Sequence, residues 1–344
     1  MQATRSFLQS LGLPPGDLND VPPSHKRFPD GAQYRVEIPS VEGPRALAAV
    51  LEEAEARQVR VHRISQGSGI MLLTDGEIRE MAQLGDEARV EVSLFVGPRA
   101  AWGTSAQILS TAGRNLGARH RGMEQLIYAV EDIKHACSLG IRSVLVADEG
   151  LLWVVSEMKK AGELPSDLVL KVSVQMGAAN PASIRLQERI GAGTYNVPTD
   201  LSAGMLAAVR AAVDLPLDIY IEVPDNFGGF VRHYEIAEIV RVAAPVYLKF
   251  GLRNAPDVYP SGTHLEETVI ALSRERVRRA EIGLAHLQRY YPDAITSELG
   301  APGLAIPKKS HPAGRGSLAH RSPSPMKGSK TTPSPIEGSE ATPS

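Results

Sequence analysis

Charged side chains that alternate with apolar ones in short stretches are the first candidates for chemistry in this sequence. The clearest cases are Glu37 in 34–39, Lys171 in 168–175, Glu222 in 217–223 and Lys249 in 245–250. Alternation of this kind is typical of a β-strand and puts the polar side chains on one face. Carboxylates can act there as general bases, and lysines can stabilise developing negative charge.

Glu222 and Lys249 form the sharpest hypothesis, because each ends one of two consecutive strands. Adjacent strands lie about 4.8 Å apart, so we expect the carboxylate and the ammonium to meet. In a hydrolytic reaction Glu222 or Glu37 would activate water, and Lys249 would stabilise the negative charge that develops. We therefore predict Glu222, Lys249 and Glu37 as catalytic residues.

Further polar residues lie at strand ends and in the loops that follow them. Arg119 belongs to a long arginine-rich loop at 97–121, and Arg253 to the loop at 251–267. Arginine is suited to binding an anionic substrate group. The predicted substrate-binding residues are Gln66, Lys171, Gln175, Asn196, Arg119 and Arg253.

These residues need a scaffold that brings many strand ends together. Eight strand-like runs alternate with helical patterns between residues 34 and 295, which favours a closed (β/α)8 barrel of the TIM type. An open doubly wound sheet is the alternative. Active sites of the barrel lie at the C-terminal ends of its strands, where the candidate residues end their runs.

The two ends of the chain are predicted to lie outside the barrel. Residues 1–33 are short and rich in proline, and we expect them to form a cover segment over the bottom of the barrel. Residues 296–344 are rich in proline, serine and glycine, and they contain a repeat, SPSPMKGSKT at 322–331 followed by TPSPIEGSEA at 332–341. Such a composition predicts a disordered tail.

Composition excludes several classes of function. The formal net charge of −2 argues against nucleic-acid binding through phosphate neutralisation, and no apolar run is long enough for a membrane span. A single cysteine, Cys137, excludes an intramolecular disulfide and makes an iron–sulfur cluster unexpected. We expect a soluble, cytoplasmic protein whose oligomeric state is left open. His62 is either an interior ligand or base, or a hydrogen-bonded structural residue, and a divalent metal stays compatible with the acidic residues.

Two segments carry a resemblance to a known family. They are PLDIYIEVPDNFGGFVRHYEIAEIV at 216–240 and VYLKFGLRNAPDVYPSGTHLE at 246–266. With the barrel-like order of elements up to about residue 295, they resemble actinobacterial members of the collagenase-like peptidases of unknown catalytic type, peptidase family U-thirty-two. The resemblance implies a peptidase-like hydrolase. This chain lacks the family's cysteine cluster, so activities that depend on that cluster are not implied.

Three functions therefore stay open. The first is a peptidase-like hydrolase acting on a small polar or anionic substrate or on a peptide. The second is a lyase or isomerase in which buried Lys249 or Lys171 forms a Schiff base or abstracts a proton. The third is a non-catalytic binding or assembly protein, which a C-terminal face closed over by side chains would favour.

Overall fold

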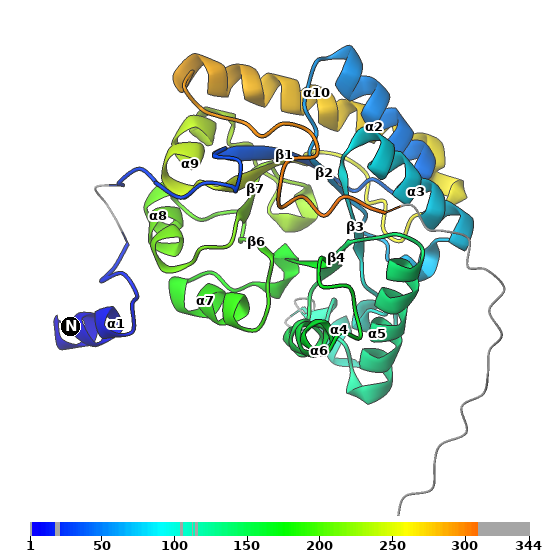
Figure 1. The fold of residues 1–344 in the computed structure, drawn as a ribbon, viewed down its shortest axis with the longest axis horizontal. Helices are drawn as coiled ribbons and strands as arrows, with labels where there is room; N and C mark the ends of the chain where they lie inside the picture. Colours follow the sequence, from blue (N-terminus) through cyan, green and yellow to red (C-terminus); the bar gives the residue numbers. More distant parts are fainter. Residues whose placement is uncertain (1, 18–20, 104–105, 112, 114–115, 309–344) are drawn as a thin grey trace, which may run out of the picture. The chain divides into compact units, whose positions relative to one another are not determined.

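The predicted barrel is confirmed. A computed structural model describes residues 2–17, 21–103, 106–111, 113 and 116–308. Within them, eight parallel strands close in sequence order, so that β1 pairs with β8 as well as with β2 (Figure 1). The strands are β1 Tyr34–Pro39, β2 Arg63–Ser65, β3 Glu91–Phe95, β4 Ser143–Val146, β5 Val169–Val172, β6 Thr194–Asn196, β7 Leu217–Glu222 and β8 Val246–Phe250.

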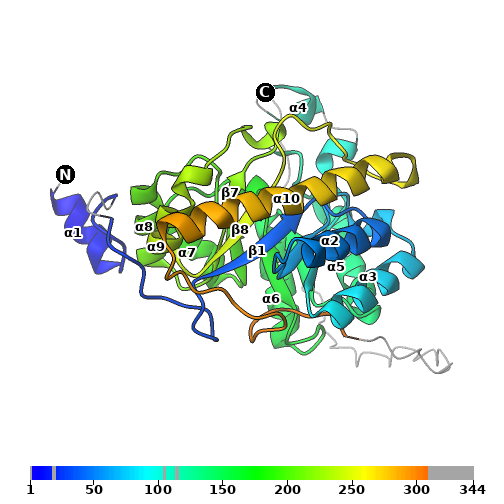
Figure 2. The ribbon, with the colours of Figure 1, turned by 90° about the horizontal axis from the view of Figure 1, so that it is seen from above.

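Helices follow the strands and surround the barrel, and α10 lies beside α2 where the ring closes (Figure 2). The α-helices are α1 Gln2–Ser10, α2 Pro44–Ala56, α3 Asp75–Ala88, α4 Ala106–Leu109, α5 Gly122–Ser138, α6 Glu149–Lys160, α7 Pro181–Arg189, α8 Ala203–Ala212, α9 Ile236–Ala243 and α10 Glu266–Tyr290. Single 3₁₀ turns are η1 Ile70–Leu72, η2 Ala100–Trp102, η4 Val174–Met176, η5 Asp225–Phe227, η6 His233–Glu235 and η7 Thr263–Leu265. No helix in the described ranges combines the length and apolar character needed to cross a bilayer.

The apolar faces of the strands point outward, because the helices need an apolar surface to pack on. Val36 and Ile38 of β1 and Leu248 and Phe250 of β8 are fully buried in this outer core. Gly283 of α10 permits one close approach, since a Cβ atom there would lie 2.4 Å from the Phe250 ring. The polar faces consequently point into the barrel.

Residues 24–33 run along the N-terminal ends of the strands. The Ser24 N–H donates to the Arg241 carbonyl at 2.7 Å, and the Val246 N–H donates to the Gln33 carbonyl at 3.0 Å. The ring of Phe28 meets Tyr247 edge to face at 5.4 Å between centroids. Residues 24–33 therefore contact the bottom of the barrel, whereas α1 contributes no buried residue.

Residues 296–308, which we name the C-terminal strap, cross the same end of the barrel, as the orange segment of Figures 1 and 2 shows. Thr296 pairs with Tyr34, and the Lys308 N–H donates to the Gly140 carbonyl at 2.9 Å. Arg35 donates to the Ser297 hydroxyl at 2.8 Å and to the Pro302 carbonyl at 2.7 Å. The prediction that the disordered tail begins at residue 296 is thus wrong for the strap, because buried polar groups at the barrel's bottom need its backbone as a partner. The rest of the predicted tail, 309–344, lies outside the described residues.

Candidate active site

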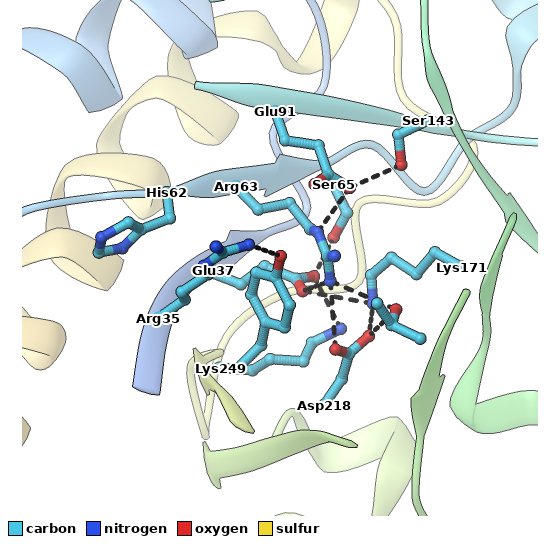
Figure 3. A network of polar contacts seen from close by, with 12 residues as sticks. Arg35, Glu37, His62, Arg63, Ser65, Glu91, Ser143, Lys171, Asp218 and Lys249 are labelled. Atoms are coloured by element: carbon cyan, nitrogen blue, oxygen red, sulfur yellow. Dashed lines mark hydrogen bonds and ion pairs between the residues drawn. The ribbon is translucent and has the colours of Figure 1, made fainter. Parts of the chain in front are cut away.

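The lower half of the barrel interior holds a network of ion pairs among fully buried side chains (Figure 3). Arg63 is its centre: Nε lies 2.8 Å from Glu91 Oε1, and Nη1 lies 3.1 Å from Asp218 Oδ1 and 3.3 Å from Glu37 Oε2. Lys171 Nζ lies 2.5 Å from Asp218 Oδ2 and 3.3 Å from Glu37 Oε2. We name these five residues the lower network.

Strand register explains why the lower network forms. Glu37 is paired in register with Arg63, and Arg63 with Glu91, so the three charged side chains are neighbours on adjacent strands. Burial alone would raise the pKa of Glu37, but the charges of Lys171, Lys249 and Arg63 outweigh it and hold that pKa well below its usual range. Glu37 is therefore ionised at neutral pH.

Lys249 lies one step higher and connects this network to an open space. Its Nζ is 2.9 Å from Glu37 Oε1 and 4.5 Å from the centre of the Tyr220 ring. With the Asn196 amide turned so that its nitrogen donates to the Asp218 carbonyl, its oxygen accepts from Lys249 Nζ at 2.9 Å. The amine is thus fixed from three sides, which leaves it directed towards the C-terminal end of the barrel.

A cavity of about 220 Å³ opens above Lys249, at the face where the strands end. It contains four of the predicted residues, Gln66, Gln175, Asn196 and Lys249. The other side chains that define its floor and walls include Ser65, Phe95, Arg99, Ser173, Tyr220, Phe227 and Tyr259. Ionic, amide, hydroxyl and aromatic groups therefore converge on one small pocket, as a ligand site requires.

The predicted substrate-binding residues have different roles in this pocket. Gln66 holds the loop after β2, because its amide oxygen accepts from the Gly69 N–H at 3.1 Å and its nitrogen donates to the Gly69 carbonyl at 3.2 Å. Gln175 is exposed at the rim of the pocket. The alternation predicts that β5 extends to Gln175, but the strand ends three residues earlier, at Val172, and the chain continues into η4. Lys171 lies below the pocket and does not line it.

The predicted meeting of Glu222 and Lys249 is wrong. An irregularity in the pairing of β7 with β8 puts Lys249 opposite Tyr220 and Glu222 opposite Phe250, so Glu222 turns away from the interior. Glu222 Oε1 accepts from the Arg253 backbone N–H at 3.0 Å, and Oε2 lies 3.7 Å from Arg279 Nε. Glu222 does not line the pocket, and it connects the loops after β7 and β8 instead.

The two predicted loop arginines also lie outside the pocket lining. Arg119 forms an ion pair with Glu149 and donates to the Met176 carbonyl at 3.2 Å, so it fastens the long loop to α6 and η4. Arg253 is 56% exposed, with its Nε 3.5 Å from Asp225 Oδ1. Neither position supports direct contact with a ligand at Lys249.

Sequence reasoning missed Arg63 and the aromatic walls of the pocket, whereas Arg99 belongs to the arginine-rich loop at 97–121 that was expected to suit an anionic group. The outward apolar side chain of Ile64 was an available signal for Arg63, because it implies that Arg63 and Ser65 point inward. Arg99 lies over the Phe95 ring at 3.7 Å, a contact between neighbouring strand and loop that alternation does not reveal.

Two roles were predicted for His62, an interior ligand or base and a hydrogen-bonded structural residue, and its contacts are those of the structural residue. Its Nδ1 accepts from the Val36 N–H at 3.0 Å, and its Nε2 lies 2.9 Å from the Ser297 carbonyl in the strap. Burial lowers its pKa to about 4, so the ring is neutral at pH 7. Cys137 is buried in the outer core, and burial raises its pKa to about 11. Within the described ranges, no three His, Cys, Asp or Glu side chains are arranged to hold a metal ion.

Comparison with known proteins gives matches among solved structures only. No family model and no curated protein matches the sequence. Among solved structures, the U32 peptidase Mk0906 is 17% identical, with 58% of this chain and 74% of that chain covered and a TM-score of 0.37. Dihydrodipicolinate synthase from Bacteroides thetaiotaomicron is 14% identical (73% and 80% covered, TM-score 0.40), and N-acetylneuraminate lyase from Mycoplasma synoviae is 11% identical (76% and 81%, TM-score 0.39).

Proposed function

We propose that this chain is a TIM-barrel enzyme of the lyase or isomerase class, which acts on a small carbonyl or carboxylate compound held above Lys249. The observation that carries the proposal is the position of Lys249 Nζ, fixed by Glu37 and Asn196 at the floor of the pocket. A cation fixed in advance at a buried floor stabilises negative charge on a substrate oxygen without having to reorganise.

The size of the pocket favours a small substrate. A volume of about 220 Å³ is below the roughly 300–1,000 Å³ of cavities that enclose drug-sized ligands. A peptide chain would need a longer groove. Because Glu222 also lies outside the pocket, the peptidase-like hydrolase implied by the sequence resemblance has less support than the lysine-based alternative. The pocket is open, so the condition that would favour a non-catalytic protein is not met.

The contacts of Lys249 favour binding of a substrate oxygen over formation of a Schiff base. Attack on a carbonyl carbon would require the amine to leave its present partners, and a carboxylate and an amide oxygen both hold it in place. Glu37 is ionised and lies 2.9 Å from the amine. We therefore assign Lys249 the task of binding the substrate oxygen and stabilising the enolate-like charge that develops on it.

The test is a ligand screen of the full-length protein against small 2-oxo acids and hydroxy acids, read by thermal shift. Lys249→Met should abolish the shift given by a hit, whereas Lys134→Met, which removes an exposed lysine of α5, should leave it unchanged. Sodium borohydride added with the hit should leave Lys249 unmodified when the protein is digested and analysed by mass spectrometry. A reduced adduct on Lys249 would replace the proposed role with Schiff-base catalysis, and a hit retained by Lys249→Met would refute the site.

A further inference from the structure

A second cavity lies beside the pocket above Lys249, between the loops that follow β7 and β8. Its volume is about 240 Å³, and Arg276 of α10 contributes to its wall. The two cavities share Ser40, Asn226, Phe227, Asp257 and Tyr259, so one wall separates them. The Tyr259 hydroxyl donates to the Ser40 hydroxyl at 2.5 Å across this shared wall.

Arg276 is a buried cation whose hydrogen bonds are incomplete. The residue is 4% exposed, Nη1 donates to the Ser40 carbonyl at 3.2 Å, and Nε has no hydrogen-bond partner. In the part of the chain that the structure describes, Arg276 takes part in no ion pair within 4 Å. Burial lowers the pKa of Arg276, and nearby Glu42 acts in the opposite direction, but both Glu42 oxygens already accept backbone N–H groups, from Gly67 at 2.6 Å and Ser68 at 3.0 Å.

A guanidinium that is buried without an ion pair favours the binding of an anion from outside the chain. A charge left buried and unpaired is destabilising, and a planar guanidinium fits the oxygens of phosphate or carboxylate. Two carboxylates also line the cavity, but each accepts a bond from the loop after β8: Asp225 from the Asn254 N–H, and Asp257 from the Tyr259 N–H at 3.1 Å. These bonds direct one oxygen of each carboxylate towards the loop.

We propose that the Arg276 cavity is a phosphate-binding subsite and that the substrate is a phosphorylated small carbonyl compound. The phosphate would bind Arg276, and the carbonyl end would reach Lys249 past the wall formed by Tyr259 and Ser40. Phosphate is favoured over carboxylate because the cavity lies between the seventh and eighth loops, where barrels of this fold frequently bind phosphate. The subsite stands on Arg276 alone, whereas its assignment to the same substrate rests on the function proposed above.

The experiment is a calorimetric titration of the full-length protein with inorganic phosphate and, separately, with acetate. Wild type should bind phosphate saturably and more tightly than acetate. Arg276→Met should weaken phosphate binding at least about tenfold, as expected when a charge-assisted hydrogen bond is removed. The matched control is Arg274→Met on the same helix, which removes an arginine paired with Glu52 and Glu53 on the surface and should leave the affinity unchanged.

A second variant guards against a folding defect in Arg276→Met. Ala255→Phe fills the cavity from its loop side and leaves Arg276 intact, so it should also abolish phosphate binding. Lys249→Met should still bind inorganic phosphate, and this separates failure of the subsite from failure of the proposed reaction. The proposal is overturned if wild type does not bind phosphate, if acetate binds as tightly, or if both cavity variants bind phosphate like wild type.

Discussion

The two halves of the barrel interior use similar side chains for opposite purposes. In the lower network, Arg63 and Lys171 lie within ion-pair distance of three carboxylates that have no exposed surface. In the upper half, Lys249 shares Glu37 with that network but borders a cavity. Height along the strand therefore decides whether an inward polar residue serves stability or ligand binding.

Lys171 and Lys249 illustrate the difference between the two halves, because both lie within a strand and point inward. Burial lowers the pKa of Lys171, while Asp218 and Glu37 act in the opposite direction, and its amine contacts Asp218 at 2.5 Å. Lys249 instead has a neutral amide and an aromatic ring as neighbours besides its one carboxylate. Replacement of Lys171 is expected to lower the stability of the fold, whereas replacement of Lys249 is expected to weaken ligand binding.

The largest effect should come from removing the strap that closes the lower half. Deletion after Ile295 leaves Arg35 without the Ser297 and Pro302 acceptors and exposes the end of β1, so we expect a loss of more than about 5 kcal/mol and an unfolded or aggregated product. Deletion after Ser310 keeps the strap and should change the unfolding free energy by less than about 0.5 kcal/mol. Urea denaturation followed by circular dichroism measures the unfolding free energy of both truncations. Equal stability of the two would show that the strap does not stabilise the barrel.

Arg63→Met should give the next largest effect. It leaves Glu37, Glu91 and Asp218 buried with fewer cations, which costs about 3–5 kcal/mol when a buried pair is broken. Arg60→Met is the matched control, because Arg60 lies three residues earlier and pairs with Glu298 at the surface, where a salt bridge contributes about 0–1 kcal/mol. Similar losses in the two variants, measured by urea denaturation, would contradict the idea that the lower network is structural.

The stability of the lower half should also depend on pH through His62. Its folded pKa of about 4 lies below the ordinary value of 6.5, so the unfolded chain takes up a proton first as the pH falls. Stability from this residue is complete above pH 6.5 and is lost between pH 6.5 and 4, by up to about 3 kcal/mol. His62→Asn should flatten this part of the pH–stability curve, and an unchanged slope would show that the histidine is not the titrating group.

Lys249→Met should have the smallest effect on stability. Glu37 keeps Lys171 and Arg63 at 3.3 Å and the Ser65 hydroxyl at 2.7 Å, so its charge stays compensated. We expect a loss of about 1–2 kcal/mol, clearly less than for Arg63→Met. Unfolding of the variant would place Lys249 with the structural residues of the lower half and contradict its assignment to ligand binding.

The fold and the inward direction of both lysines could be predicted from alternation alone. Lys171 and Lys249 are buried inside the barrel as expected, because each is flanked by apolar residues that must face the helices. Arg63 was missed because the alternation of His62 with Val59 and Val61 suggested that His62 faces the interior of the barrel. Alternation indicates which side chains share a face of a strand. It does not indicate how far along the barrel axis each of these side chains lies.

The Glu222 error has a different origin. Its strand alternates in sequence as far as Val223, and nothing in the residue types reveals the irregularity that turns Glu222 outward. The early end of β5 before Gln175 and the ordered strap were missed for a related reason, because a strand end and a segment that packs by its backbone leave little trace in side-chain patterns. The second cavity depends on Arg276, a residue of α10 that lies far from any strand end in the sequence.

The strap also has a consequence for how the chain is made. β1 is synthesised early, but its β8 partner at 246–250 and the strap at 296–308 come last. At about 5–20 residues per second, β1 waits roughly 15–55 s for them with one edge unpaired. An unpaired strand edge invites pairing with other chains. Yield during synthesis is therefore expected to depend on chaperones that shield this edge, however stable the finished barrel is.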